Sequence, residues 1–168
     1  METEVVGLNM LAFSGSALHT MDTKGRVFVP TAYREALGEK FVLSLNNDLR
    51  AMALYPLDEW KANCEALARI PSTDRKGKNY VRYFFGNTFE DWSLDSQGRL
   101  LIPPTLREMF GLTEPKDVRF IGVGECLELW AADQYHGLQM SENPLADEAL
   151  DYVYENYYRL SANENKEG

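Results

Sequence analysis

Cysteine, histidine and long apolar runs are scarce in this chain of 168 residues, and each scarcity excludes a class of protein. The two cysteines, Cys64 and Cys126, are far apart and have no C-x-x-C partner, which favours reduced, buried thiols over a disulfide or a zinc site. His19 and His136 have no second metal-ligating side chain at a suitable spacing. We therefore expect no metal and no cofactor.

Apolar runs stay well below the ~20 residues that a membrane-spanning helix needs, and acidic residues near the amino terminus argue against a secretory signal. We expect a cytoplasmic protein without membrane association. The motifs G-x-S-x-G and H-E-x-x-H and a glycine-rich phosphate loop are missing as well, so we do not expect an enzyme. The carboxylates fall in predicted turns and an exposed helix, where their pKa should stay near normal.

Acidic residues outnumber basic ones, and the net charge is -9. Residues 1–110 hold 13 Lys and Arg against 14 Asp and Glu, whereas residues 111–168 hold 4 against 12. Because electrostatic steering depends on local potential, the nearly neutral first part can still present a basic face to a polyanion.

An internal repeat organises the chain. The segment D-T-K-G-R-V-F-V-P-T-A-Y-R at residues 22–34 aligns without gaps on D-S-Q-G-R-L-L-I-P-P-T-L-R, which begins 73 residues later. The identical pairs are Asp22/Asp95, Gly25/Gly98, Arg26/Arg99, Pro30/Pro103 and Arg34/Arg107. We therefore expect two copies of one module.

Each copy is predicted to be a β-β-α-β-β unit. A strand enters the D-x-x-G-R loop, a second strand leaves it, and a proline opens a short helix at its first position and a glycine closes it. Two more strands form a hairpin. After the entering strand, the expected strands are 26–29, 41–45 and 52–55 in the first copy and 99–102, 118–123 and 126–130 in the second, and the helices end at Gly38 and Gly111.

Helices are expected to follow the first copy and to end the chain. Apolar spacing predicts a helix over 57–70 with Asp58 as its cap and Pro71 as its stop, and we favour a helix over an aromatic-rich strand at 80–85. Residues 145–160 should form an amphipathic helix before a polar, frayed end. The predicted division is 16–60 for repeat 1, 61–86 for a helical linker, 88–133 for repeat 2, and 134–168 for the C-terminal helix and acidic tail.

Each fixed residue of the D-x-x-G-R loop has a physical role. Gly25 can take the positive φ of a tight loop, and Asp22 can accept backbone hydrogen bonds across it. Arg26 is then displayed in a defined direction, where a guanidinium fits the guanine edge or a phosphate, and Lys24 adds charge at the tip. The alternative is that Asp22 and Arg26 only clamp the turn. Asp95, Gly98 and Arg99 repeat the arrangement.

Arg34 and Arg107 follow the two loops on the predicted helices. They can reach phosphate or pair with Glu35 and Glu108, and we slightly favour the pairing. The basic stretch Arg75, Lys76 and Lys78 falls in a predicted turn, where a solvated linker is favoured over a DNA contact. The three tryptophans, Trp60, Trp92 and Trp130, lie in apolar patterns and are expected in the core or at a subunit contact.

The strings D-T-K-G-R-V-F-V-P-T-A-Y-R-E-A-L, Y-P-L-D-E-W, D-S-Q-G-R-L-L-I-P-P-T-L-R-E-M-F-G-L and G-V-G-E-C-L-E-L-W resemble the MraZ family. The resemblance implies an α+β, mainly β fold, in which two tandem SpoVT-AbrB repeats build one swapped-hairpin β-barrel. It also implies a nucleoid-associated transcription regulator of the division and cell-wall gene cluster, which binds repeated promoter boxes in double-stranded DNA as a ring-like homo-oligomer. Carried over by position, the DNA-facing residues are Lys24, Arg26 and Arg99, with Arg34 and Arg107 as further candidates, and Asp22 and Asp95 organise the loops.

This chain departs from the family pattern in places. Residues 1–11 look like an extension, Gln97 stands where the first loop has Lys24, and the acidic C-terminal helix lies outside the resemblance. The alternative function is an antitoxin-like protein-interaction module whose acidic C-terminal segment binds a basic partner.

Overall fold

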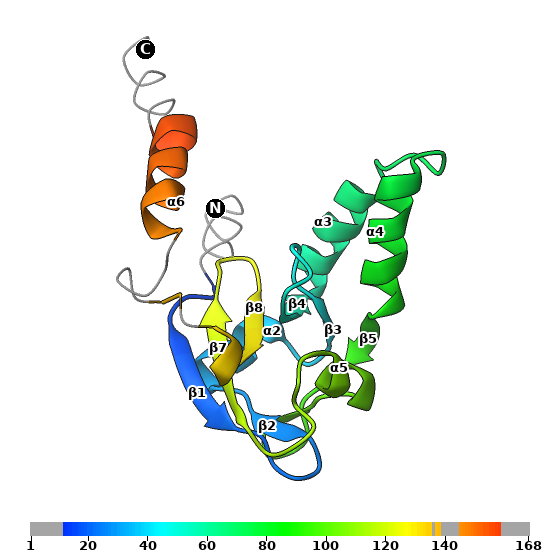
Figure 1. Ribbon diagram of the computed structural model, residues 1–168. Helices are drawn as coiled ribbons and strands as arrows, with labels where there is room; N and C mark the ends of the chain where they lie inside the picture. The colour runs from blue at the N-terminus through cyan, green and yellow to red at the C-terminus, as the bar shows by residue number, and fades with distance from the viewer. Residues whose placement is uncertain (1–11, 136, 139–144, 159–168) are drawn as a thin grey trace, which may run out of the picture. The chain divides into compact units, whose positions relative to one another are not determined.

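The computed structural model describes residues 12–135, 137–138 and 145–158 (Figure 1). The chain forms two compact units, Met1–Ala132 and Asp133–Gly168. The first unit holds both copies of the repeat, and the second holds the C-terminal helix.

Both repeats have the predicted β-β-α-β-β order. The first consists of β1 (Ser16–Thr20), β2 (Arg26–Phe28), α2 (Thr31–Leu37), β3 (Phe41–Leu45) and β4 (Met52–Pro56), followed by α3 (Leu57–Leu67) and α4 (Arg75–Gly86). The second consists of β5 (Phe89–Trp92), β6 (Arg99–Leu101), α5 (Pro104–Met109), β7 (Asp117–Gly122) and β8 (Leu127–Ala131). A 3-10 turn, η1 (Ala132–Gln134), follows β8.

The two repeats exchange strands. A six-stranded antiparallel sheet has the order β1-β7-β8-β4-β3-β5, and a separate two-stranded ribbon pairs β2 with β6. The first strand of each repeat therefore pairs with a strand of the other repeat, β1 with β7 and β5 with β3. Neither repeat can complete its sheet alone.

The described strands do not form the closed barrel that the resemblance implies. β1 and β5 are the edges of the six-stranded sheet, and the short strands β2 and β6 pair only with each other. Each D-x-x-G-R loop therefore joins a strand of the large sheet to a strand of the ribbon. The mixed α+β, mainly β class and the exchange between the halves are confirmed.

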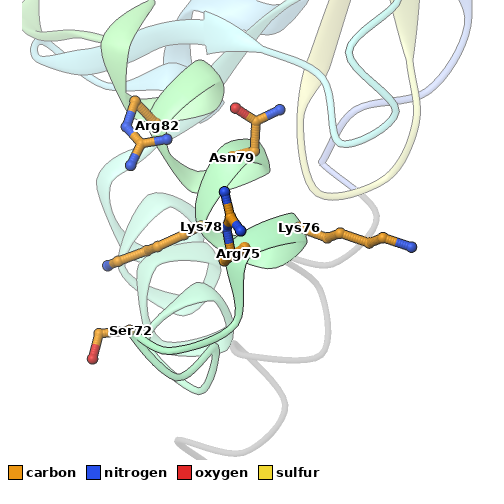
Figure 2. Close-up of a pocket in the computed structure, with 6 residues that line it drawn as sticks. All are labelled: Ser72, Arg75, Lys76, Lys78, Asn79 and Arg82. Carbon is orange, nitrogen blue, oxygen red and sulfur yellow. The ribbon is translucent and has the colours of Figure 1, made fainter.

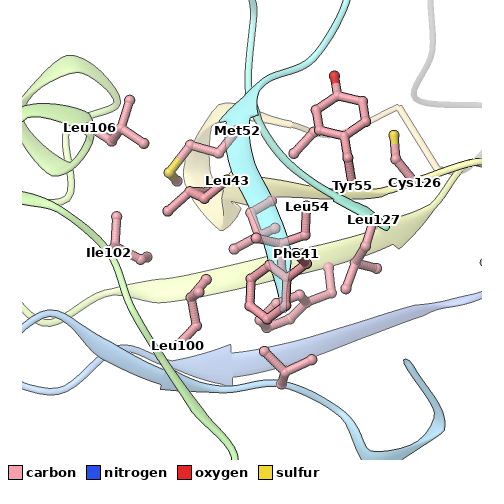
Figure 3. Close-up of a cluster of buried hydrophobic side chains, with 14 of the residues drawn as sticks. Phe41, Leu43, Met52, Leu54, Tyr55, Leu100, Ile102, Leu106, Cys126 and Leu127 are labelled. Carbon is pink, nitrogen blue, oxygen red and sulfur yellow. The ribbon is translucent and has the colours of Figure 1, made fainter. Parts of the chain in front are cut away.

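Side chains of both repeats share one hydrophobic core. Figure 3 shows Phe41, Leu43 and Leu54 of the first repeat together with Leu100 and Ile102 of the second. All five of these side chains are fully buried. Because burial of apolar surface is the main favourable contribution to folding, the core stabilises the exchanged arrangement as a whole.

The helices differ from prediction mainly at their ends. Pro30 and Pro103 are the N-cap residues of α2 and α5 rather than their first helical residues, although Pro104 opens α5. α3 ends at Leu67, before the expected stop, and Asp58 lies in its first turn instead of capping it. α2 is closed by Gly38 as predicted, whereas Gly111 lies one residue beyond the C-cap of α5.

Residues 80–85 are helical, as we favoured. They belong to α4, which is capped by the Asp74 carboxylate accepting from Gly77 N, so Arg75, Lys76 and Lys78 lie in its first turns and not in a loop. Phe84 of α4 is fully buried and its ring stacks on Trp60, with 5.6 Å between the centroids. Trp60 and Trp130 are buried and Trp92 is half-buried, in agreement with their expected core positions.

The C-terminal unit contains α6 (Ala146–Val153), which continues into the π-helical turn η3 (Tyr154–Tyr158). The predicted helix over 145–160 is confirmed to residue 158, and Leu160, the polar end 161–168 and His136 lie outside the described residues. Both cysteines are free thiols, with Cys126 buried and Cys64 half-buried. In the described part of the chain, no helix has the length and apolar composition that crossing a membrane requires.

Candidate nucleic-acid interface

The first D-x-x-G-R loop is held by one carboxylate. Asp22 Oδ1 accepts from the backbone N–H groups of Lys24 and Arg26, both at 2.9 Å, and Asp22 Oδ2 accepts from Arg26 Nε at 2.8 Å. Lys24 is exposed at the loop tip. The acid thus fixes both the backbone of the loop and the direction of its arginine.

The second loop has the same geometry. Asp95 Oδ1 accepts from Gln97 N at 3.0 Å and Arg99 N at 2.9 Å, and Oδ2 accepts from Arg99 Nε at 2.8 Å. The Asp–Arg clamp that we considered as an alternative is therefore present in both loops. It does not remove the arginines from the surface, because the side chains of Arg26 and Arg99 are 30% and 20% exposed.

These hydrogen bonds lower the pKa of both aspartates. For Asp22 the largest cause is the backbone hydrogen bond from Arg26, and for Asp95 it is the equivalent bond from Arg99, with the guanidinium groups adding to the effect. Our expectation of near-normal carboxylate pKa values is therefore wrong for the two loops. It is also wrong for Glu59, whose pKa is raised by burial. The pKa of a carboxylate in a turn departs from its normal value when the turn donates hydrogen bonds to that carboxylate.

Arg34 and Arg107 hold the loops from the opposite repeat. Arg34 Nε donates to Val29 O at 2.8 Å, and its guanidinium lies against Gly98 of the second loop. Arg107 Nε donates to Ile102 O at 3.0 Å and lies in the same way against Gly25 of the first loop. The ion pairs of the described residues do not include the expected pairing with Glu35 or Glu108.

The loop glycines are required for two reasons. Gly25 and Gly98 have φ of +83° and +81°, which side chains other than glycine rarely adopt. A Cβ on Gly25 would also lie 2.6 Å from Arg107 Nε, and one on Gly98 would overlap the Arg34 guanidinium. The same glycines accept backbone hydrogen bonds across the repeats, Gly98 O from Val29 N at 3.1 Å and Gly25 O from Ile102 N at 2.9 Å.

The ribbon of β2 and β6 brings the two loop arginines to one surface. Val27 and Leu100 are buried, so the alternation of side chains along a strand directs their neighbours outward. The outward residues are Arg26 and Phe28 on β2 and Arg99 and Leu101 on β6, with Phe28 paired to Arg99 and Arg26 to Leu101. The Arg99 guanidinium carbon lies 5.9 Å from the centre of the Phe28 ring. We call these four residues the ribbon face.

Sequence reasoning located the loop residues but missed Phe28 and Leu101. Both are large apolar side chains in an exposed position, 43% and 45% accessible. The alternation of R-V-F-V and R-L-L-I carries this signal, because the second and fourth residues of each run are the buried ones. From the sequence, each run was interpreted only as a strand. In the described residues, no cluster of three or more His, Cys, Asp or Glu side chains is arranged to hold a metal ion.

These features define a protein class: two fused β-β-α-β-β repeats that exchange strands and hold twin D-x-x-G-R loops at the ends of a shared ribbon. The chain belongs to the MraZ family. The model of that family, described as "MraZ protein, putative antitoxin-like", matches residues 12–82 and 84–152.

Curated relatives are named transcriptional regulator MraZ. The protein of Desulfitobacterium hafniense (strain DSM 10664 / DCB-2) is 44% identical over 119 residues, which cover 71% of this chain and 80% of the relative. Those of Acetivibrio thermocellus and Carboxydothermus hydrogenoformans are 42% identical over 136 residues and 37% over 145, covering 80% and 84% of this chain and 92% and 99% of the relatives. The family is one of transcriptional regulators and not of enzymes, which confirms both predictions at that level.

Arg107 lies close to Gly25, so substitution of Gly25 should destabilise the protein more than substitution of a glycine that is needed only for its positive φ. Gly111, with φ +71° and open space around its Cβ position, is the matched control. We expect Gly111→Ala to cost about 1 kcal/mol of unfolding free energy and Gly25→Ala about 1 kcal/mol more, because Arg107 must move and lose its hydrogen bond to Ile102 O. Chemical denaturation of both variants measures the difference, and equal losses would contradict the packing of Arg107 on the loop.

Titration of the loop aspartates tests the clamp. The pKa of Asp22 and Asp95 is lowered from 3.8, so their contribution to stability is complete above pH 3.8 and is lost as the pH falls through the lower folded-state pKa. NMR titration of the side-chain carboxyl carbons should give two similar values below 3.8. In Asp22→Asn the signal of Asp95 should keep its low pKa, and a normal value for either aspartate in the intact protein would refute the clamp.

Proposed function

We propose that this chain binds double-stranded DNA through the ribbon face and the two loops beside it, and recognises a base sequence there. The observation that carries the proposal is the placement of two identically clamped arginines, Arg26 and Arg99, on one outward surface. A two-stranded β-ribbon is narrow enough to enter the major groove. The ribbon face then meets the base edges while the loop tips lie near the phosphates.

The clamp and base recognition are compatible. An arginine has five N–H donors, and the aspartate uses the one on Nε. The terminal amino groups can still donate together to O6 and N7 of guanine, the commonest specific contact of arginine in DNA. Because the Asp–Arg bond orients the guanidinium before DNA arrives, less side-chain entropy is lost on binding. The exposed Phe28 and Leu101 can contact thymine methyl groups.

The remaining cations have supporting roles in this proposal. Lys24 at the first tip contacts phosphate, and Gln97 at the second tip does so with a weaker, uncharged contact. Arg34 and Arg107 hold the opposite loops in place and add positive potential at the ends of the ribbon, where they can also reach phosphate. The two loops therefore contribute unequally to affinity, although they have the same backbone geometry.

Several subunits must act together. One subunit offers two base-reading arginines, and each bidentate contact supplies only ~1–3 kcal/mol of discrimination. We propose that a ring-like homo-oligomer engages repeated promoter boxes of the division and cell-wall gene cluster, because linkage of sites raises avidity by ~10²–10⁴-fold. The protein would then act in the cytoplasm at the nucleoid.

A second candidate function is an antitoxin-like interaction in which the acidic C-terminal segment binds a basic protein. Two observations favour it: the description of the matching family model, and the exposure of the acidic residues Asp147, Glu148 and Asp151 on α6. The same segment can also serve DNA binding, as a contact between subunits.

Substitution of the loop arginine separates the two functions. We expect Arg26→Ala to weaken binding to a duplex from the promoter upstream of the protein's own gene by about 10- to 100-fold, and Arg26→Lys nearly as much, because lysine lacks the fork. Lys24→Ala should weaken binding to all sequences alike and reduce its salt dependence. Fluorescence anisotropy measures each affinity.

Arg69→Ala serves as the control, because Arg69 is an exposed arginine in the turn after α3, outside the D-x-x-G-R loops. It should bind DNA like the parent protein. Full affinity of Arg26→Ala, combined with loss of binding on removal of residues 141–168, would favour the interaction module and overturn the proposal.

A further inference from the structure

The helices α3 and α4 follow the first repeat, α6 follows the second, and α4 and α6 carry opposite charges. The spacing of 73 residues that aligns the D-x-x-G-R loops also places three basic residues of α4 on acidic residues of α6 and the turn after it. The corresponding pairs are Arg75/Glu148, Lys78/Asp151 and Arg82/Glu155. Aromatic residues keep the same register, with Phe84/Tyr157 and Phe85/Tyr158. Arg75, Lys78 and Arg82 thus each have a carboxylate as counterpart, whereas Lys76 falls on Ala149.

The cations Arg75, Lys78 and Arg82 form a stripe on one side of α4. Their spacing of three and four residues places them on one helical face, and Figure 2 shows Lys76 extending to the other side from Lys78. The stripe borders a surface hollow of ≈ 520 Å³, which Ser72, Lys76 and Asn79 also line. No ion pair among the described residues involves these cations. We call this set the basic stripe.

The basic stripe is electrostatically unfavourable for an isolated helix. Like charges three or four residues apart repel each other, and Arg75 lies in the first turn, where the helix dipole disfavours a cation. An acidic partner with the same spacing would relieve both repulsions.

Such a partner exists on the same chain. Glu148 and Asp151 of α6, with Glu155 in the following turn, form an acidic stripe of the same spacing, and all three are exposed. Leu150 and Val153 lie on the other side of α6 and are 59% and 39% exposed. The counterpart α4 differs in this respect, because it buries Phe84 against α3.

We propose that the acidic stripe of one subunit docks on the basic stripe of a second copy of this chain. The contact joins the C-terminal unit of one subunit to the first unit of the next, so it is heterologous and propagates from subunit to subunit until it closes into a ring. It rests on the proposed function, since it supplies the assembly that repeated boxes require.

The position of the basic stripe favours this partner over DNA. The stripe starts at the first residue of α4, near the tip of the hairpin formed with α3, whereas the ribbon with β2 lies at the other end of the same unit (Figure 1). A duplex held on the ribbon face would therefore leave the hairpin tip free for another subunit.

Charge reversal on each stripe tests the contact with the full-length protein. Arg75→Glu with Arg82→Glu reverses the basic stripe, and Glu148→Arg with Glu155→Arg reverses the acidic stripe. We expect each double variant to raise the concentration for half-maximal assembly by about tenfold or more, and the fourfold combination to restore assembly, because the same pairs form with exchanged signs. Sedimentation velocity at several salt concentrations measures the assembled mass.

Lys40→Glu with Lys61→Glu makes the same change in net charge at two exposed lysines outside the stripe, before β3 and in α3, and should assemble like the parent protein. Parent-like assembly of either stripe variant, or failure of the fourfold variant to assemble while its circular dichroism is native, would overturn the proposal.

DNA affinity for a duplex with a single promoter box distinguishes this inference from the proposed function. The stripe variants should keep the parent affinity, whereas Arg26→Ala should lose affinity and still assemble. A basic-stripe variant that assembles normally but binds the single box weakly would identify the stripe as a phosphate contact and refute docking of a second copy.

Discussion

The reciprocal contact of two arginines with two glycines governs the architecture of the site. Arg34 of the first repeat lies on Gly98 of the second loop, and Arg107 of the second repeat lies on Gly25 of the first. Each arginine also binds a carbonyl at the end of its own ribbon strand. Each loop is therefore shaped from within by its aspartate and supported from outside by the other repeat. Loss of Arg34 or Arg107 should therefore disturb the loop of the opposite repeat.

The local parts of this arrangement could be predicted from the sequence, and the long-range parts could not. Short sequence patterns predict the D-x-x-G-R loops, their aspartate clamps and most of the strands. Pairing of β2 with β6 depends on residues far apart in the chain, so no local pattern shows that Arg26 and Arg99 share a surface. For the same reason the partner of Arg34 was misjudged, since Glu35 is its neighbour in sequence and Gly98 is its neighbour in space.

The distribution of charge agrees with the proposed roles of the loops in DNA binding and of the two stripes in subunit contact. The first unit carries the loop arginines and the basic stripe, and the acidic residues concentrate in the last third of the chain. A net charge of -9 looks unsuitable for a DNA-binding protein when it is considered alone. If the acidic stripe of each subunit is paired with the basic stripe of the next, that part of the acidic surface is covered in the assembly, while the loop cations stay on the surface.

Contact between the ribbon face and the bases of DNA is the central claim. The most direct measurement is NMR of the arginine Nε–Hε groups and of the leucine methyl groups during titration with the promoter duplex. We predict that Arg26, Arg99 and Leu101 shift strongly and specifically, whereas Arg69 and Arg75 do not. Unchanged signals from Arg26 and Arg99 in a saturated complex would show that DNA binds elsewhere and would contradict the claim.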